Sequence, residues 1–207
     1  MADPNLSSLL KWSVENSEAS HNTTTTNTPQ TQPSRPPNPA ALAALFGGAS
    51  DADLMKQAMH TVQSNAPLAD RLTAFDNFEQ LVENLDNANN MGPLGLWTPV
   101  LEQLYSPEAD IRRMAAWCIG TAVQNNIQTQ EKLVVMEGIP RLVKMVLEEE
   151  DRQARRKAVY ALSSSIRNCQ PATDAAVKAL PREVVGEEKL FAQDMVRIDS
   201  IMNTLRK

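Results

Sequence analysis

The sequence is poor in aromatic residues and in glycine. Aromatics make up 4% of the 207 residues and only 7 residues are Gly, whereas Ala, Leu and Val are plentiful. Ala and Leu favour helices, while aromatic and β-branched residues favour strands. The composition therefore predicts an all-α protein, long enough for one domain of about 150 residues plus a tail.

Long apolar runs and a surplus of basic residues are also missing. No run approaches the ~20 residues of a membrane span, and the N-terminus lacks the basic start and apolar core of a signal peptide. The net charge of −5 argues against general nucleic-acid binding, which needs a basic surface. We therefore expect a cytoplasmic protein that binds neither a membrane nor nucleic acid.

Few side chains are available for chemistry, since the chain has two cysteines and two histidines. Cys118 and Cys169 show no CxxC spacing, which favours buried thiols in a reducing compartment over a disulfide. His21 lies in a polar stretch, and His60 lies on an amphipathic helix where a lone histidine is usually a surface or core-edge residue. No metalloprotease, serine-hydrolase, zinc or phosphate-loop pattern is present. We expect no catalytic residue, no metal site and no cofactor.

What the sequence does contain is a repeat. Residues 111–126, which include Arg112 and Trp117, return in degraded form 43 residues later, with Arg155 and Tyr160 at the matching positions. Three prolines, at positions 99, 140 and 181, follow one another at intervals of 41 residues. Helical repeats of roughly 40–47 residues are typical of HEAT and armadillo proteins. The predicted fold is therefore an armadillo-like α-solenoid.

Two segments of different character precede the repeats. Residues 1–17 contain a short amphipathic helix, with Leu9 and Leu10 on its apolar stripe and Trp12 beside it. Residues 18–39 hold a run of threonines and five prolines, but no Leu, Ile, Val or aromatic residue, so we predict a disordered linker. The helix either caps the chain's own solenoid or serves as a recognition peptide at the end of the linker.

The solenoid domain is predicted to occupy residues 40–207. Its expected helices are, in chain order, 40–46, 51–64, 67–87, 97–105, 107–126, 128–137, 141–149 and 194–205. The last helix should cap the exposed end of the core with a polar outer side. The Arg-Arg pairs should give solvated faces and local ion pairs worth well under about 1 kcal/mol. The Asn-rich end of the third helix is either a C-cap and turn or a hydrogen-bonding patch at the rim of the concave surface.

Several blocks of the sequence resemble one protein family. They are LLKWSVENS at 9–17, LFGG at 45–48, AFDNFEQLVENLDNANN at 74–90, IGTAVQNN at 119–126 and YALS at 160–163. In this order, over most of residues 6–170, the chain resembles the fungal cytosolic, armadillo-type nucleotide exchange factor of the seventy-kilodalton heat-shock chaperone, a relative of the animal heat-shock-binding protein. The two asparagine-rich blocks are specific enough to identify the family.

The resemblance implies a monomer without catalytic groups, which binds the ATPase domain of that chaperone through its concave face so that ADP leaves and ATP enters. It also implies that Leu9, Leu10 and Trp12 occupy the chaperone's substrate groove in place of a client. From this we predict a set of partner-binding residues: Ala88, Asn89, Asn90, Asn125, Asn126, Arg167 and Asn168. The last four lie at the ends of long helices, where capping is a sufficient explanation.

Two other classes of function stay open at this point. One is an armadillo adaptor of another kind, such as a carrier of basic peptides or a scaffold. Such carriers use many successive repeats with a ladder of Trp and Asn, whereas here Trp117 is followed by Tyr160. The other class is an enzyme, which would need a constellation of side chains that the sequence does not offer.

Overall fold

The computed structural model describes residues 49–206, and all regular structure within this range is helical. The helices follow one another as α4 (Asp51–Gln63), α5 (Leu68–Val82), α6 (Leu85–Asn90), α7 (Trp97–Glu102), the 3₁₀-helix η1 (Gln103–Tyr105), α8 (Ala109–Val123), α9 (Ile127–Val135), α10 (Gly138–Glu148), α11 (Arg152–Ile166), α12 (Gln170–Ala179), α13 (Arg182–Val185) and α14 (Met195–Leu205). The predicted all-α class is confirmed. The predictions for residues 1–17, 18–39 and 40–46 lie outside the described residues.

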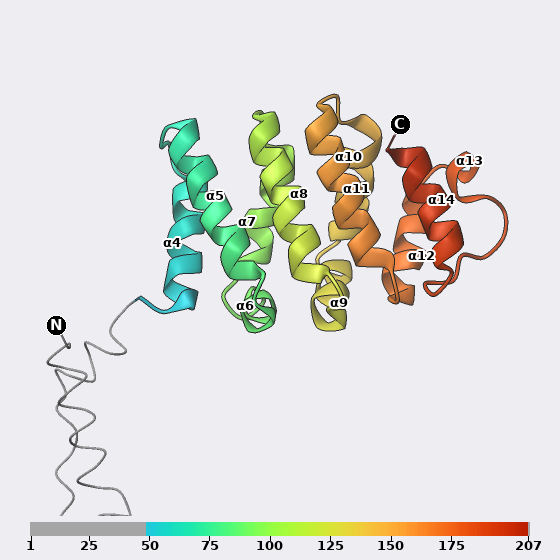
Figure 1. Cartoon of the computed structure of the whole chain (residues 1–207), viewed down its shortest axis with the longest axis horizontal. Coiled ribbons are helices and arrows are strands. Elements are labelled where there is room, and N and C mark those ends of the chain that lie inside the picture. The colour runs from blue at the N-terminus through green and yellow to red at the C-terminus, as the bar shows by residue number, and fades with distance from the viewer. Residues whose placement is uncertain (1–48, 207) are drawn as a thin grey trace, which may run out of the picture. The chain divides into compact units, whose positions relative to one another are not determined.

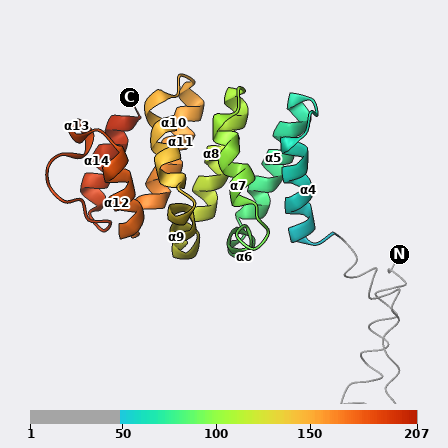
Figure 2. The same ribbon diagram turned by 180° about the vertical axis from the view of Figure 1, so that it is seen from behind.

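The helices stack in repeating units to form a solenoid (Figure 1). The third helices of successive units, α5, α8, α11 and α14, lie side by side on one side of it. The second helices α4, α7 and α10 lie on the opposite side, as the view from behind shows (Figure 2). The short first helices α6, α9 and α12 complete three units, and the helix pair α4–α5 precedes them. The armadillo-like arrangement predicted from the repeat is therefore confirmed.

The three evenly spaced prolines mark where the second helices begin. Pro99 and Pro140 are each the third residue of their helix, and Pro181 directly precedes α13. The first turn of a helix leaves its amide groups without partners inside the helix, so a residue without an N–H costs little there.

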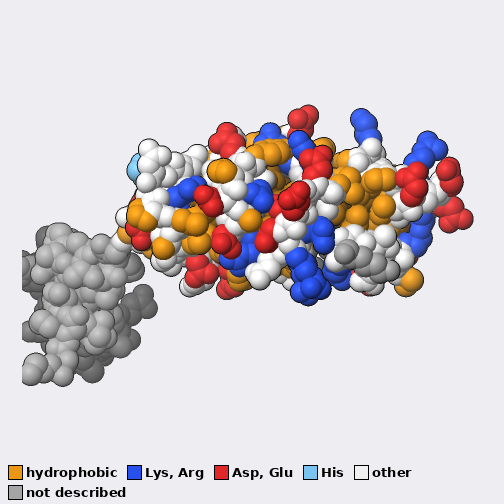
Figure 3. Space-filling model, turned by 90° about the horizontal axis from the view of Figure 1, so that it is seen from above, with side chains coloured by type: hydrophobic (Ala, Val, Ile, Leu, Met, Phe, Trp, Pro, Cys, Tyr) orange, Lys and Arg blue, Asp and Glu red, His pale blue; other side chains and the backbone are white. Residues whose placement is uncertain are grey.

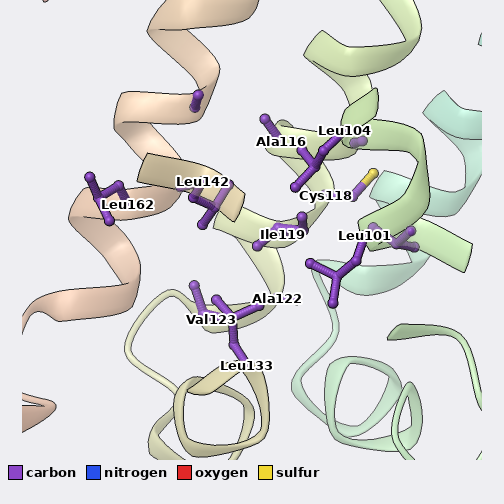
Figure 4. Packing of buried hydrophobic residues seen from close by; sticks show 14 of the residues in the cluster. Leu101, Leu104, Ala116, Cys118, Ile119, Ala122, Val123, Leu133, Leu142 and Leu162 are labelled. Atoms are coloured by element: carbon purple, nitrogen blue, oxygen red, sulfur yellow. The ribbon is translucent and has the colours of Figure 1, made fainter. Parts of the chain in front are cut away.

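The core runs between the second and third helices along the whole solenoid. Figure 4 shows its central part, where side chains of α8 such as Ile119 and Cys118 meet Leu101 of α7 on one side and Leu142 of α10 on the other. All four of these side chains are at most 1% exposed. Small residues allow α8 and α11 to pack closely, and the fully or almost fully buried ones are Ala115, Ala116, Ala122, Ala158 and Ala161.

An arginine joins each of the third helices α5, α8 and α11 to the end of the second helix before it. The three arginines are Arg71, Arg112 and Arg155, spaced 41 and 43 residues apart. Their guanidinium groups donate to backbone carbonyls at the end of α4, just after η1 and just after α10, at 2.8, 2.8 and 3.5 Å. Carbonyls at a helix end lack partners inside the helix, so these arginines act as caps supplied by the neighbouring helix.

Arg112 makes a second contact that the sequence did not predict. Its guanidinium forms a two-point ion pair with Glu149 of the next unit, with N–O distances of 2.6 and 2.7 Å, and the Glu149 side chain is 3% exposed. The prediction of solvated faces and local ion pairs is therefore wrong for Arg112. It holds for Arg113, which pairs with Asp110 three residues away at 3.0 Å.

The helix predicted over residues 67–87 is in fact two helices. α5 ends at Val82, and the side chain of Asn84 accepts hydrogen bonds from the amides of Asp86 and Asn87, at 2.9 and 3.4 Å. This is the geometry of an N-cap. The Asn-rich stretch therefore opens the first helix of a new unit instead of closing α5.

The last unit is predicted only in part. α12 and α13 are absent from the sequence-based prediction, whereas α14 matches it. The Asp194 side chain caps α14 by accepting a hydrogen bond from the Arg197 amide at 3.1 Å. Its outer side is mostly polar, as predicted for a cap, with exposed Asp199, Ser200, Asn203 and Thr204, although Val196 is 81% exposed on the same helix.

Candidate functional site

The outward sides of α5, α8 and α11 form what we call the third-helix face, which is toward the viewer in Figure 1. A shallow hollow of about 380 Å³ lies on it. The hollow is lined by Glu79, Glu83, Trp117, Thr121, Gln124, Asn125 and Tyr160. Three successive third helices, α5, α8 and α11, thus contribute side chains to one surface feature, as expected of a solenoid that binds a large partner.

Two aromatic side chains form the centre of this face. Trp117 and Tyr160 occupy equivalent positions on α8 and α11, and Gly120 makes room for Tyr160, because a Cβ there would overlap the tyrosine ring. The Tyr160 hydroxyl donates to the Gln124 side chain at 3.0 Å. Lys157 places its ammonium group 3.3 Å from the centre of the Trp117 ring, a cation–π contact.

Glu79 is a buried carboxylate at the bottom of the hollow. It is 4% exposed and accepts a hydrogen bond from the Thr121 hydroxyl at 2.7 Å. Burial raises the pKa of Glu79 above its ordinary value, and the nearby charge of Glu83 adds to this, although the hydrogen bond from Thr121 opposes it. Burial also lowers the pKa of Lys157, which the charge of Glu79 partly restores. Perturbed groups of this kind gather at functional sites more often than elsewhere.

Ala88 does not lie on a surface. Its side chain is 2% exposed and belongs to the hydrophobic core, because α6 turns this small residue inward. The prediction that Ala88 contacts a partner is therefore wrong, and a charged side chain at this position would be placed in the core. Of its neighbours, Asn89 is half-buried and Asn90 is exposed.

Asn125 and Asn168 follow α8 and α11 in the left-handed conformation. Their φ angles are 52° and 58°, values that Asn tolerates better than most residues. The capping explanation given for these positions is therefore confirmed. Both side chains are nevertheless exposed, so they remain available to a partner.

Asn126 and Arg167 are engaged within the fold. Asn126 is 6% exposed and donates to the Asn89 side chain at 2.9 Å, so the expectation that it contacts a partner is not met by its burial. Arg167 forms an ion pair with Asp199 at 2.5 Å and donates to the Ser163 hydroxyl at 3.0 Å, while staying partly exposed. The contacts of Asn126 with Asn89 and of Arg167 with Asp199 join neighbouring units, whereas that of Arg167 with Ser163 lies within one unit.

Of the residues that line the hollow, sequence reasoning predicted Asn125 as a partner contact and missed the others. The signal was present in the repeat, because spacings of 41 and 43 place Glu83, Gln124 and Arg167 at equivalent positions, as they do for Trp117 and Tyr160. What the repeat could not reveal is the depth of Glu79, which depends on how closely α5 and α8 pack.

Residues 49–206 offer little for chemistry of their own. No group of three or more His, Cys, Asp or Glu side chains in this range could hold a metal ion. Cys118 and Cys169 are free and buried, as predicted, and burial raises the pKa of the Cys118 thiol well above its ordinary value. His60 is exposed on α4. Among the described helices none has the length and apolarity needed to cross a bilayer.

Comparison with protein families agrees with the resemblance found in the sequence. Residues 6–91 match the family described as "Nucleotide exchange factor Fes1". Residues 87–194 match the "SIL1/FES1/HPBP1 C-terminal domain". The two matches meet at α6, and the second extends past Pro181 into the last unit.

Curated fungal proteins are similar over the whole chain. The Hsp70 nucleotide exchange factor FES1 of Gibberella zeae is 50% identical over 212 residues, which cover 100% of this chain and 98% of the relative. The protein of the same name from Coccidioides immitis is 50% identical over 208 residues, covering 99% and 98%. The Neurospora crassa protein fes-1 is 43% identical over 239 residues, covering 99% and 97%. The chain therefore belongs to the Fes1 family of nucleotide exchange factors.

Proposed function

We propose that this protein is a nucleotide exchange factor of Hsp70, which binds the ATPase domain of the chaperone through the third-helix face. The observation that carries this proposal is 50% identity over the full chain to relatives that bear this name. The hollow between α5, α8 and α11 supports the choice of face, because aromatic side chains beside polar ones are typical of protein interfaces.

The proposed activity needs no catalytic group in this chain. A protein that binds the ADP-free ATPase domain more tightly than the ADP-bound form lowers the affinity for ADP. By linkage, ADP weakens the binding of this protein by the same factor. The stack of units suits this role, because an extended surface can fit one shape of the partner better than another.

The N-terminal part has a separate role in this proposal. Leu9, Leu10 and Trp12, within a recognition helix in residues 1–17, occupy the substrate groove of Hsp70 in place of a client. Residues 18–39 form the linker that supplies reach to the solenoid of residues 40–207. The protein acts as a monomer in the cytoplasm. There it binds Hsp70, the chaperone that the names of its relatives give.

Release of a fluorescent ADP analogue from Hsp70, followed by stopped flow, tests the proposed function. The full-length protein should accelerate release, whereas Trp117→Ala should weaken binding by about tenfold or more, as expected for a central aromatic residue. Tyr105→Ala is the matched control, since Tyr105 is 54% exposed but belongs to η1 and does not line the hollow. An unchanged release rate with the unmodified protein would contradict the proposal.

Substitution of Trp12 tests the separate role of the N-terminal part. Trp12→Ala should leave ADP release close to normal and slow the displacement of a bound client peptide. Loss of both activities to the same degree would show that the two parts are not independent.

Asn125 and Asn168 can be tested without disturbing the fold. Glycine tolerates their positive φ angles, so Asn→Gly removes the amide and keeps the turn. Weaker binding by a variant with unchanged thermal stability would assign a partner contact to the amide. Unchanged binding would leave these residues as caps alone.

A further inference from the structure

We propose that the third-helix face is polarised in charge along the solenoid, and that its partner presents basic side chains to α5 and acidic side chains to α11. Charge would then decide which way round the partner docks. This inference rests on the proposed function, because the partner is taken to be the Hsp70 ATPase domain. To that function it adds the charge of the partner's surface and the orientation of that surface on the third-helix face.

The α5 end of the face is acidic. α5 contains three acidic residues and one basic residue, and that basic residue, Arg71, donates to a carbonyl at the end of α4. Asp76 and Glu83 are exposed, and Glu79 lies buried between them. No described basic residue forms an ion pair with any of these three carboxylates.

The α11 end of the face is basic. α11 contains four basic residues and no acidic residue, and it is directly preceded by exposed Glu150 and Asp151. Arg155 donates to the carbonyl of Glu149, and Lys157 lies over the Trp117 ring. Arg152 and Arg156 are both exposed, and neither forms an ion pair with another described residue.

The change of sign follows the repeat. At one set of equivalent positions α5, α8 and α11 are followed by Glu83, Gln124 and Arg167, in this order, so the side chain changes from acidic through neutral to basic, and Arg167 pairs with Asp199 of α14. Seen from above, by contrast, acidic and basic side chains are interspersed over the units (Figure 3). The segregation of charge is therefore a property of the third-helix face and not of the whole surface.

Such an arrangement favours one orientation of the partner. A surface with the opposite polarity is attracted at both ends, whereas the same surface turned end to end meets like charges at both. Charge pairs of this kind speed up the first encounter and lose strength as salt screens them. The aromatic centre at Trp117 and Tyr160 would supply contact area without setting direction.

Charge reversal at each end tests the polarity. Two double variants are compared with the unmodified full-length chain, Asp76→Lys with Glu83→Lys, and Arg152→Glu with Arg156→Glu. Each should slow association with the purified Hsp70 ATPase domain by about tenfold or more at low salt, and the difference should shrink as salt is added. Glu102→Lys and Lys178→Glu, which are exposed on α7 and α12, are the matched controls and should associate at the normal rate.

Photo-crosslinking tests the orientation directly. A crosslinking residue at position 83 should capture a basic region of the ATPase domain, and one at position 156 should capture an acidic region. Crosslinks with the reverse assignment would overturn the inference. So would reversal variants that associate normally while the unmodified protein accelerates ADP release, since that result keeps the proposed function and rejects the polarity. An unmodified protein without effect on release would instead contradict the proposed function.

Discussion

At the scale of single residues, two buried glutamates have pKa values that are shifted in opposite directions by their different partners. Glu149 has a two-point partner in Arg112, and the hydrogen bonds from that guanidinium lower its pKa. Glu79 has a single hydroxyl partner, and burial raises its pKa. The two carboxyl groups should therefore give opposite dependences of stability on pH.

Glu149→Gln should destabilise the protein at neutral pH by about 1.5–3 kcal/mol, the usual worth of hydrogen bonds to a charged group. The stabilisation from Glu149 is present above the pKa of the unfolded chain, about 4.3. It is lost as the pH falls through the lower pKa of the folded protein. Urea unfolding of both proteins between pH 3 and about 7 measures this, with exposed Glu150→Gln as the control. A difference that persists unchanged at the lowest pH would contradict the prediction.

Glu79→Gln should show the opposite trend. Because the folded-state pKa of Glu79 is raised, its contribution to stability is fully present below the unfolded pKa and is lost as the pH rises through the folded value. The variant should therefore gain stability relative to the unmodified protein between about pH 4 and neutrality. The same unfolding series measures it. Equal pH slopes for the two proteins would mean that the Glu79 carboxyl is not perturbed.

At the scale of the helices, the closest joint is that between α8 and α11. A methyl group at Gly120 would overlap the Tyr160 ring and would lie 3.1 Å from the backbone of Ala161. Gly120→Ala should therefore destabilise the protein by about 1–3 kcal/mol through overpacking, despite the better helix propensity of alanine.

Thermal unfolding of Gly120→Ala against Gly92→Ala tests this joint. The nearest atom to a Cβ at Gly92 is 3.8 Å away, so that substitution should change stability little. If Gly120→Ala were as stable as its control, the tyrosine ring would have to move aside at no cost.

Helix periodicity and the repeat predicted α4, α7 to α11 and α14, but not the boundary between α5 and α6. The apolar positions Leu81, Val82 and Leu85 continue one helical pattern across the break, so periodicity alone cannot reveal it. The signal for the new helix is Asn84, whose capping role depends on the amides that follow it. α13 has only four residues, too few to show a period.

The candidate site was predictable only in part, because burial depends on contacts between units. The repeat identifies Trp117 and Tyr160 as equivalent, and chain position identifies Asn125 and Asn168 as helix ends. Burial of Ala88 and Asn126 depends on contacts between units that the sequence does not record. An alanine within an asparagine-rich run is predicted to lie on the surface. In the structure, the short helix α6 buries Ala88.

At the scale of the whole molecule, stability should vary along the stack. A unit in a solenoid contacts only its neighbours, so within residues 49–206 the central helices α8 and α11 have a described neighbour on both sides, whereas α4 and α14 have one on one side. Hydrogen exchange of the folded protein should show the slowest amides in α8 and α11 and faster exchange in α4 and in α13–α14. Uniform protection along the chain would indicate a single cooperative block.

The arginine joints have a consequence for the length of the protein. Each joint uses the same side chain and the same kind of carbonyl acceptor, so adding a unit calls for no new chemistry at its boundary. Duplicating the 43-residue stretch that starts at Arg112 and stops before Arg155 should therefore yield a longer solenoid in which the arginine contacts between units are kept. A solenoid whose units are joined in this way can be lengthened or shortened by whole units, so the number of units sets the length of its binding surface.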